Sequence, residues 1–323
     1  MKPLKLVPDD TNIPFLKYRN IAVTFSVALI VAALALCVIK GFNLGIDFVG
    51  GQMVRVTFAQ PVAIDSLRDR VESLGVGEAT IQLFGSDREV SIRTPLPEGD
   101  AAAADRAASN IRATIERNYP GAKVGAVESV SGKVSNELFR TGAISLTLAM
   151  IAITLYVWMR FEWQFGVGAL FALFHDVALT LGFFALTQLE FDLNIVAAIL
   201  TIIGYSLNDT IVVYDRIREN LRKYRKMDIA DLLDLSINET LSRTVVTSLS
   251  VGIVLTILLV LGPDVIFGFT AAMLLGIVIG TFSSVYVSAA ILLWLRLKPD
   301  SFIAKPAPGG AERVRAEDGA ERV

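Results

Sequence analysis

An acidic residue, Asp209, lies inside a long apolar run of the sequence. The run covers residues 197–214 and is apolar enough to cross a lipid bilayer. A carboxylate is costly at membrane depth, so it usually faces a protein interior, where it often carries protons or ions. Such a group can bind and release a proton when its surroundings alternate between burial and the presence of a nearby cation. The alternative interpretation is a permanent hydrogen bond or ion pair between two helices.

Four polar residues precede Asp209, and we call them the polar stripe: Thr201, Tyr205, Ser206 and Asn208. Tyr205 and Ser206 lie four and three residues before the acid, and Thr201 lies two turns before it, so a helix would bring all three onto one face. Asn208 flanks the acid and can donate to a neighbouring helix. Lipid cannot satisfy such groups, and we therefore expect the polar stripe to face the other helices.

Three further residues are candidates for a proton relay with Asp209. Arg243 precedes the fifth apolar stretch, where its long side chain can either reach toward Asp209 or anchor the helix at the headgroups. His175 and Asp176 are adjacent in the third stretch. Neighbours on a helix point in different directions, so we do not expect these two to pair with each other. A histidine titrates near neutral pH, which favours a relay role, and a structural hydrogen bond is the alternative.

Composition limits the class of protein. The chain has 323 residues, of which 53% are apolar and 19% charged, and its net charge is −2. This balance is typical of a membrane protein and does not favour a nucleic-acid partner. Cys37 is the sole cysteine and His175 the sole histidine, so we expect no internal disulfide and no metal site built from His and Cys. No pattern in the sequence indicates a cofactor.

Six stretches are long and apolar enough to span a bilayer, which takes roughly 20 residues. They are residues 21–39, 141–159, 165–186, 192–214, 245–261 and 267–295. The first is too long for a signal peptide and no small-residue cleavage pattern follows it, so we interpret it as a retained anchor. The expected fold is an α-helical membrane protein with one helix over residues 20–40 and a five-helix bundle over residues 141–297.

Positive charges predict which side of the membrane each connection faces. Lys and Arg are frequent before the first stretch and between the fourth and fifth, whereas the short loops 187–191 and 262–266 carry none. This bias marks the cytoplasmic side. Both termini are therefore predicted inside, and residues 41–140 are predicted outside.

Three segments are predicted to be cytoplasmic: the tail 1–19, the loop 215–244 and the tail 298–323. Residues 216–238, which are basic at first and then carry acidic and leucine residues, either form a helix on the membrane surface, with their cations near anionic lipid, or are a solvated connector. The last tail is rich in Pro, Gly, Ala and charge, and we expect it to be disordered.

The predicted outside segment contains an α+β domain. Apolar spacing predicts strand, helix, strand, strand, helix and strand over residues 52–59, 64–74, 80–84, 89–94, 101–118 and 122–130. This order matches the split βαβ, ferredoxin-like arrangement. A widely shared fold does not indicate a function. No catalytic constellation is found in this segment, which favours binding or mechanical coupling over enzymatic chemistry.

A glycine-rich stretch, GIDFVGG, leads from the first span into this domain. Gly45, Gly50 and Gly51 permit tight turns where the chain leaves the bilayer and begins a strand. Asp47 can cap a helix or pair at the interface. Taken alone, the stretch is equally consistent with an ordinary turn.

Two further stretches, together with GIDFVGG, carry a resemblance to a known protein family. Residues 204–220 read GYSLNDTIVVYDRIREN, and residues 238–244 read NETLSRT. With the six-span plan and one large first loop, these stretches resemble the SecF family, which belongs to the SecD–SecF group of the RND superfamily. The resemblance covers nearly the whole chain, and the stretch around Asp209 is its most specific part.

The resemblance implies half of an RND-type transporter that pairs with SecD and associates with the Sec channel of SecY, SecE and SecG. Such a subunit lies in the cytoplasmic (inner) membrane of a bacterium and uses the proton gradient to promote export of unfolded polypeptides. It also implies a role for Asp209 in proton transport. Two rival interpretations are a half-size RND exporter of small molecules or lipids and a non-transporting scaffold, for which Asp209→Asn would keep full export.

Overall fold

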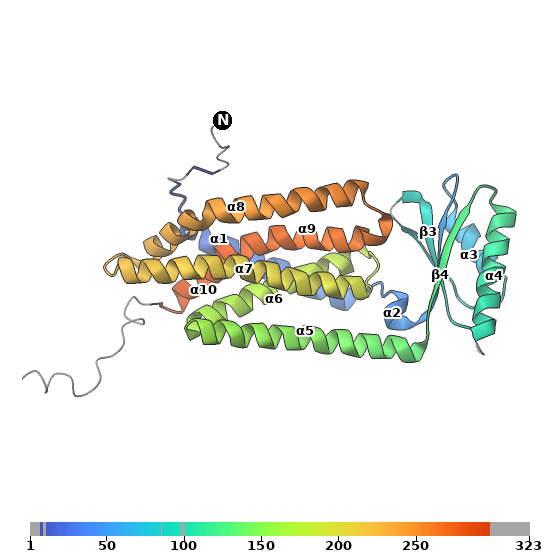
Figure 1. Cartoon of the computed structure of the whole chain (residues 1–323), viewed down its shortest axis with the longest axis horizontal. Coiled ribbons are helices and arrows are strands. Elements are labelled where there is room, and N and C mark those ends of the chain that lie inside the picture. The colour runs from blue at the N-terminus through green and yellow to red at the C-terminus, as the bar shows by residue number, and fades with distance from the viewer. Residues whose placement is uncertain (1–6, 9–10, 85, 98–100, 298–323) are drawn as a thin grey trace, which may run out of the picture.

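The computed structural model describes residues 7–8, 11–84, 86–97 and 101–297, and it consists of a helical bundle joined to a small α+β domain (Figure 1). In this part of the chain, six helices are long and apolar enough to cross a membrane, as the sequence predicted. They are Phe15–Ile39, Gly132–Arg160, Trp163–Thr187, Leu193–Lys223, Ile229–Leu261 and Phe267–Trp294. The tail 298–323 lies outside the described residues, as do residues 1–6 and 9–10.

The spanning segments comprise the following elements. The first is η1 (Phe15–Tyr18) followed by α1 (Arg19–Ile39), and the middle four are α5 (Gly132–Arg160), α6 (Trp163–Thr187), α7 (Leu193–Lys223) and α8 (Ile229–Leu261). After η2 (Asp264–Ile266), the last segment is α9 (Phe267–Phe282), the π-helical turn η3 (Ser283–Val287) and α10 (Ser288–Trp294).

α7 packs against α5, α6, α8 and α9. Two glycines spaced four residues apart bring α9 close to α7: a Cβ on Gly276 would lie 2.4 Å from Ile202, and one on Gly280 would lie 3.0 Å from Ser206. Small residues let helix backbones approach, and van der Waals contact then stabilises the pair in a medium that supplies no hydrophobic driving force.

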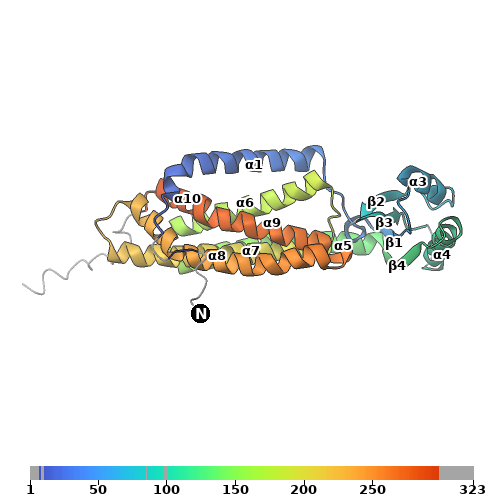
Figure 2. The same ribbon diagram turned by 90° about the horizontal axis from the view of Figure 1, so that it is seen from above.

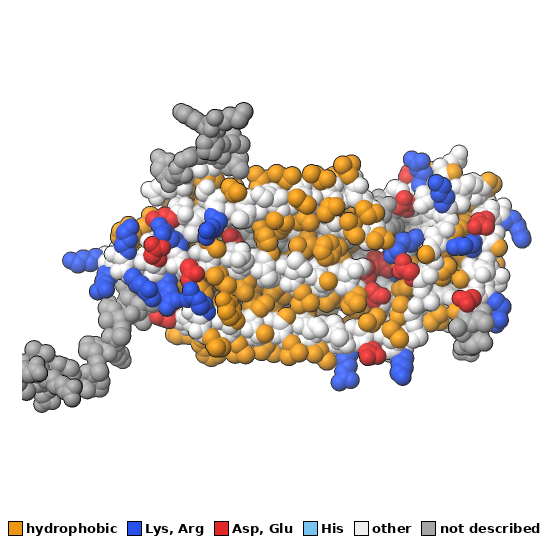
Figure 3. All heavy atoms as spheres, in the orientation of Figure 1, with side chains coloured by type: hydrophobic (Ala, Val, Ile, Leu, Met, Phe, Trp, Pro, Cys, Tyr) orange, Lys and Arg blue, Asp and Glu red, His pale blue; other side chains and the backbone are white. Residues whose placement is uncertain are grey.

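The outer surfaces of α1, α5 and α8 are apolar along most of the bundle. Large side chains such as Phe25, Leu148 and Ile257 are more than half exposed. Figure 3 shows the parts of this belt on α5 and α8 in orange, between two ends where charged side chains gather. An apolar surface of this extent is unfavourable in water but is covered by lipid chains. The chain is a multi-pass membrane protein.

Along the sequence, the α+β domain comes between α1 and α5. Its elements are α2 (Ile46–Val49), β1 (Gly51–Thr57), α3 (Ile64–Glu72), β2 (Thr80–Phe84), β3 (Ser86–Thr94), α4 (Ala101–Asn118) and β4 (Lys123–Val130). The strands form one antiparallel sheet in the order β2-β3-β1-β4, with Val54 opposite Ile92 on β3 and Val127 on β4. This is the predicted ferredoxin-like order.

The sheet has an apolar face and a polar face, because successive strand residues point to opposite sides. Val54, Val56 and Phe58 are buried with side chains of α3 and α4, as their alternation predicted. Figure 2 shows the sheet on the bundle side of α3 and α4. The polar face, which includes Arg55 and Ser91, therefore points toward the membrane bundle and lines a cavity there.

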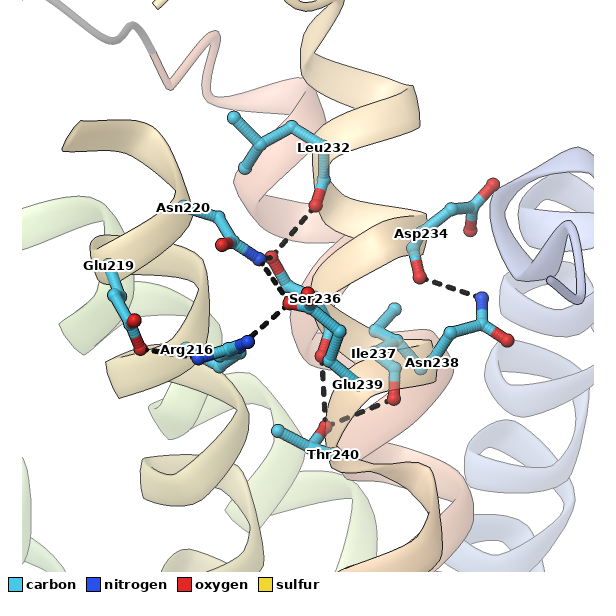
Figure 4. Close-up of polar contacts among 10 residues, drawn as sticks. All are labelled: Arg216, Glu219, Asn220, Leu232, Asp234, Ser236, Ile237, Asn238, Glu239 and Thr240. Atoms are coloured by element: carbon cyan, nitrogen blue, oxygen red, sulfur yellow. Dashed lines mark hydrogen bonds and ion pairs between the residues drawn. The ribbon is translucent and has the colours of Figure 1, made fainter. Parts of the chain in front are cut away.

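The segment 215–244, expected to be a loop, is almost entirely helical. α7 and α8 continue through it and leave only residues 224–228 as a turn. The two helix ends pair: Arg216 Nε donates to Glu239 Oε2 at 2.7 Å, and Asn220 Nδ2 donates to the same oxygen at 2.6 Å (Figure 4). Because these polar groups bond to each other, the segment extends the bundle, and the expectation of a separate surface helix or connector is wrong.

The stretch NETLSRT begins with a residue that fastens the N-terminal segment. Asn238 exchanges two hydrogen bonds of 2.9 Å with the backbone of Ile13, and Asp234 Oδ1 accepts the N–H of Leu16 at 2.9 Å. The chain before α1 is thereby held against α8.

Candidate functional site

Asp209 is buried in the membrane bundle, with 7% of its surface exposed. Its two carboxyl oxygens are bonded to hydroxyl groups from other helices. Thr244 Oγ1 on α8 donates to Oδ1 at 2.7 Å, and Ser284 Oγ on η3 donates to Oδ2 at 2.6 Å. The carboxyl therefore joins three spanning segments through neutral donors.

No cation pairs with Asp209 within the described part of the chain. The predicted partner, Arg243, is exposed, and the next residue, Thr244, occupies the inward position. Successive helix residues point about 100° apart, so only one of the two can face α7. The expected contact with Arg243 is not formed in this structure, and its role stays a prediction.

A second buried carboxyl, Asp176 on α6, is 0% exposed. Ser206 Oγ on α7 donates to its Oδ2 at 2.5 Å, and Ser283 Oγ on η3 donates to the same oxygen at 2.9 Å. The Nδ1 atom of His175 lies 2.9 Å from Oδ1. The expectation that His175 and Asp176 do not pair is therefore wrong. Both side chains are excluded from water, and leaving them unpaired would cost more than bending toward each other.

The same two elements serve both carboxyls. α7 supplies the Ser206 donor to one carboxyl and carries the other, while the consecutive residues Ser283 and Ser284 of η3 bond to Asp176 and Asp209 respectively. A π-helical turn shifts the angle between successive residues, and such turns are frequent at functional sites. A displacement of η3 or α7 would therefore change the surroundings of both acids together.

The polar stripe divides between two faces of α7. Ser206 is buried, and Tyr205 points inward, where its hydroxyl donates to Ser248 on α8 at 3.3 Å. Thr201 and Asn208 are instead exposed. Within this chain the four residues therefore do not share one face, because seven residues make nearly two full turns and place Thr201 and Asn208 together on the opposite side from Ser206. Whether these two face a partner's helices stays a prediction.

Three hydroxyl residues of the site were not predicted as carboxyl partners: Thr244, Ser283 and Ser284. The available signal was the pair of consecutive serines inside an otherwise apolar span, since buried hydroxyls in membranes require partners. The serines alone do not show which carboxyl each would meet.

The glycine-rich stretch joins the α+β domain to the N-terminal end of α7. Gly51 has a φ of +120°, and a Cβ there would lie 2.7 Å from the carbonyl oxygen of Thr94, so the turn into β1 requires glycine. Asp47 Oδ2 accepts the N–H of Leu193 at 3.0 Å. Of the roles considered for Asp47, the structure shows a helix cap, because this N–H belongs to the first turn of α7.

Two carboxyls lined by hydroxyls can hold or pass protons, since each hydroxyl both donates and accepts. Among the residues that the structure describes, no group of three or more His, Cys, Asp and Glu side chains is arranged to hold a metal ion. The hydroxyl-lined carboxyls are suited to proton binding.

Two family models match the chain. The model described as "Protein export membrane protein SecD/SecF, C-terminal" matches residues 110–298, which is more than half of the chain and includes Asp176 and Asp209. The model described as "SecD/SecF GG Motif" matches residues 35–62, which include Gly50 and Gly51.

Known proteins named "Protein translocase subunit SecF" are similar over most of the chain. The one from Desulfurispirillum indicum is 44% identical over 288 residues, which are 88% of this chain and 92% of that protein. The one from Vibrio alginolyticus is 41% identical over 313 residues, which are 97% of this chain and 98% of that protein.

Solved structures of SecDF share the fold. The crystal structure of SecDF, a translocon-associated membrane protein from Thermus thermophilus, has a TM-score of 0.83 and 36% identity over 91% of this chain. SecDF in a super-membrane-facing form has a TM-score of 0.65 and 32% identity over 100% of this chain. The match covers 40% and 42% of those chains, so this chain spans about two fifths of their length. From the family models and the relatives that it matches along most of its length, the chain belongs to the SecF family of protein translocase subunits.

Proposed function

We propose that this chain is an accessory subunit of a bacterial protein translocase and couples the proton gradient to polypeptide export. One observation carries the proposal: the Asp209 carboxyl is buried in the bundle and bonded to hydroxyls from two other helices. The relatives named protein translocase subunit SecF support the translocase assignment. The role is conformational coupling rather than covalent catalysis.

A carboxyl held by neutral hydroxyls accommodates both of its forms. The anion accepts hydrogen bonds from Thr244 and Ser284, and after protonation one hydroxyl turns and accepts instead. A permanent ion pair would favour the anion alone. One charge crossing 100 mV releases about 2.3 kcal/mol, which is enough to shift an equilibrium between two helix arrangements roughly 50-fold.

We place the α+β domain on the outer side of the inner membrane and both termini in the cytoplasm. The charge asymmetry supports this orientation. Arg216, Arg222 and Lys223 lie at the end of the bundle away from the domain, while the loops 188–192 and 262–266, next to the domain, carry no Lys or Arg.

A SecD-type partner would pack on the exposed face of α7. This face carries small and polar residues where α5 and α8 expose large apolar ones, and it consists of Asn194, Ala197, Thr201, Gly204 and Asn208. Thr201 bonds to the Ala197 carbonyl of its own helix and Asn194 to Asp192, but lipid cannot bond to the Asn208 side chain, and the small residues permit close approach of another helix. This chain matches only about two fifths of each SecDF chain, so the remaining part of a SecDF chain is long enough to include such a second half.

In the proposed cycle, the Sec channel of SecY, SecE and SecG delivers an unfolded polypeptide to the outer side. Protonation of Asp209 changes the packing of α7, α8 and η3, and the α+β domain moves because Asp47 fastens it to α7. SecDF from Thermus thermophilus is a translocon-associated membrane protein, and its similarity to this chain supports a position beside the channel.

The test is export of a reporter polypeptide in inverted membrane vesicles, with and without a proton gradient. Asp209→Asn should abolish the gradient-dependent part of export, because the amide cannot release a proton. The matched control is Asp215→Asn, the same chemical change at an exposed residue of the same helix that pairs with Arg160 at 3.1 Å. Full gradient stimulation in Asp209→Asn would contradict proton coupling and favour the scaffold interpretation.

A further inference from the structure

The chain that leaves α1 is bonded to the loop between α6 and α7. The N–H of Gly45 donates to the carbonyl of Phe191 at 2.9 Å, and the N–H of Phe191 donates to the carbonyl of Asn43 at 2.8 Å. Leu44 and Phe191 form a parallel bridge. The connection to the α+β domain is therefore part of the outer end of the bundle.

Arg93 on β3 attaches the sheet to this same connection. Its guanidinium donates to the carbonyl of Leu44, to Oδ1 of Asn43 and, at 3.2 Å, to Oε1 of Gln82. The residue is almost entirely buried. Burial of a guanidinium between two structural units is costly unless its donors are bonded, so this contact defines one docked position of the domain.

Glu190 lies at this junction and is half-buried. A Cβ on Gly45 would lie 2.9 Å from its Oε1, so the motif glycine leaves the space that this carboxyl occupies. Glu190 also lines a cavity of about 400 Å³ between the polar face of the sheet and the bundle. Ser91, which lines the cavity too, is buried, and its hydroxyl has no hydrogen-bond partner among the described residues.

Charged groups from each element around the junction act on Glu190. Arg93 on β3 and Arg55 on β1 attract its anion, while Asp192 in its own loop and Glu128 on β4 repel it. The oxygens of Asp192 are already hydrogen-bonded: they accept from the N–H of Ile195 and from Asn194, and this side chain thereby caps α7. Glu190 is thus the carboxyl that faces both the cavity and the docking arginine.

We infer that Glu190 is a proton-binding site on the outer side of the bundle, and that a proton bound there stabilises the docked position of the α+β domain. This inference deepens the proposed function, and it rests on that function for the orientation of the domain toward the acidic side of the gradient. The ligand is a proton that arrives from water in the cavity.

The direction in which pH changes the docking of the domain follows from the burial of the Glu190 carboxyl. Burial raises the pKa of Glu190 above its usual value, and Arg93 offsets only part of this effect. A carboxyl with a raised pKa binds protons more tightly when docked than when hydrated. Docking is therefore most stable at low pH and weakens as pH rises through the raised pKa, which lies above the ordinary glutamate value of about 4.3.

The test measures the distance between the domain and the bundle by double electron–electron resonance. Spin labels are placed at Asp69→Cys on α3 and Leu261→Cys at the outer end of α8, both exposed, in a Cys37→Ala chain reconstituted with its partner in nanodiscs. In the labelled chain without further substitutions, we expect a longer distance to become populated as the pH rises from about 4 to about 8. The series starts at about 4, which is near the ordinary pKa of a glutamate carboxyl.

Glu190→Gln should stay docked and reduce the long-distance population at pH 8 at least about threefold, because it mimics the protonated form. Glu116→Gln is the matched control, the same chemical change at an exposed carboxyl of α4, which packs on the other face of the sheet, and it should keep the pH response. A second variant, Gly45→Ala, displaces the Glu190 carboxyl and should shift the midpoint of the response. A distance independent of pH, or an unchanged response in Glu190→Gln or Gly45→Ala, would overturn the inference.

The same labels separate this inference from the proposed function. In an Asp209→Asn chain, gradient-driven export should be abolished, whereas adding Glu190→Gln should still reduce the long-distance population at pH 8. If Asp209→Asn exports normally but Glu190→Gln removes the distance change, only the role of Asp209 is lost. If export depends on Asp209 but the distance does not depend on Glu190, only the inference about the outer site is lost.

Discussion

At the scale of single residues, the two buried carboxyls differ in how firmly they are held. Asp176 is fully enclosed and is bonded to Ser206, Ser283 and His175. Asp209 keeps a small exposed fraction and is bonded to two hydroxyls. We therefore expect Asp209 to exchange protons and Asp176 to hold α6, α7 and η3 together. A relay through Asp176 and His175 stays a proposal.

Ser284→Ala tests the hydroxyl that supports the Asp209 anion. A hydrogen bond to a charged group contributes about 1.5–3 kcal/mol, so its loss should lower gradient-driven export at least about tenfold, the factor that ~1.4 kcal/mol represents. The measurement is the gradient-dependent rate of reporter export. Ser250→Ala is the control, because that hydroxyl is exposed on α8 and bonds to the Val246 carbonyl of its own helix. Equal rates in the two variants would contradict a supporting role for Ser284.

At the scale of elements, the contact between α9 and α7 decides where η3 presents its serines. Gly276 lies directly against Ile202, and Gly280 lies against Ser206, so the axial position of α9 is fixed by shape. The helices α7 and α8 are further joined by Arg216 and Glu239, at the end of the bundle away from the α+β domain. These contacts hold the donors of Asp209 at hydrogen-bond distance.

Gly276→Ala should lower the stability of the bundle, because its Cβ would lie 2.4 Å from the side chain of Ile202. Overpacking of this kind typically costs about 1–3 kcal/mol. The measurement is thermal unfolding of the purified chain in detergent. Gly252→Ala on α8 is the control, since nothing lies within 4 Å of a Cβ there. A melting temperature that falls no further in Gly276→Ala than in the control would contradict the tight contact.

At the scale of the whole molecule, the bundle has one face unlike the others. α1, α5 and α8 present large apolar side chains to lipid, whereas α7 presents the small and polar face assigned above to a partner. The α+β domain is attached at the N-terminal end of α7, through Asp47. The helix that carries Asp209 therefore contacts both the domain and the proposed partner.

Gly204→Leu should weaken association with a SecD-type partner, because it adds a large side chain to the exposed face of α7. Nothing in this chain lies within 4 Å of a Cβ at Gly204, so the stability of the isolated chain should not change. The measurement is copurification of the partner, together with thermal unfolding of the chain alone. Gly252→Leu, at a comparably open glycine on α8, should leave copurification intact. Equal association of both variants would exclude this face as the interface.

The sequence by itself determined the six spans and the strand–helix order of the α+β domain. Span length and apolar periodicity are local properties, so residues such as Val54 and Val56 could be assigned to a buried face without knowing their partners. It also singled out Asp209, because a carboxyl inside an apolar run is unusual whatever surrounds it. The sequence does not predict the continuation of α7 and α8 through residues 215–244, since the bonds to Glu239 that join the two helices come from Arg216 and Asn220, 23 and 19 positions away.

Only the tertiary structure decided which groups meet. Asp209 bonds to residues 35 and 75 positions away in the chain, and no local pattern specifies such neighbours. A rotation of one residue on α8 placed Thr244 rather than Arg243 against the carboxyl. The proximity of Glu190, Gly45 and Arg93 likewise arises from three separate elements, because the docking of the sheet on the bundle depends on packing across the whole molecule.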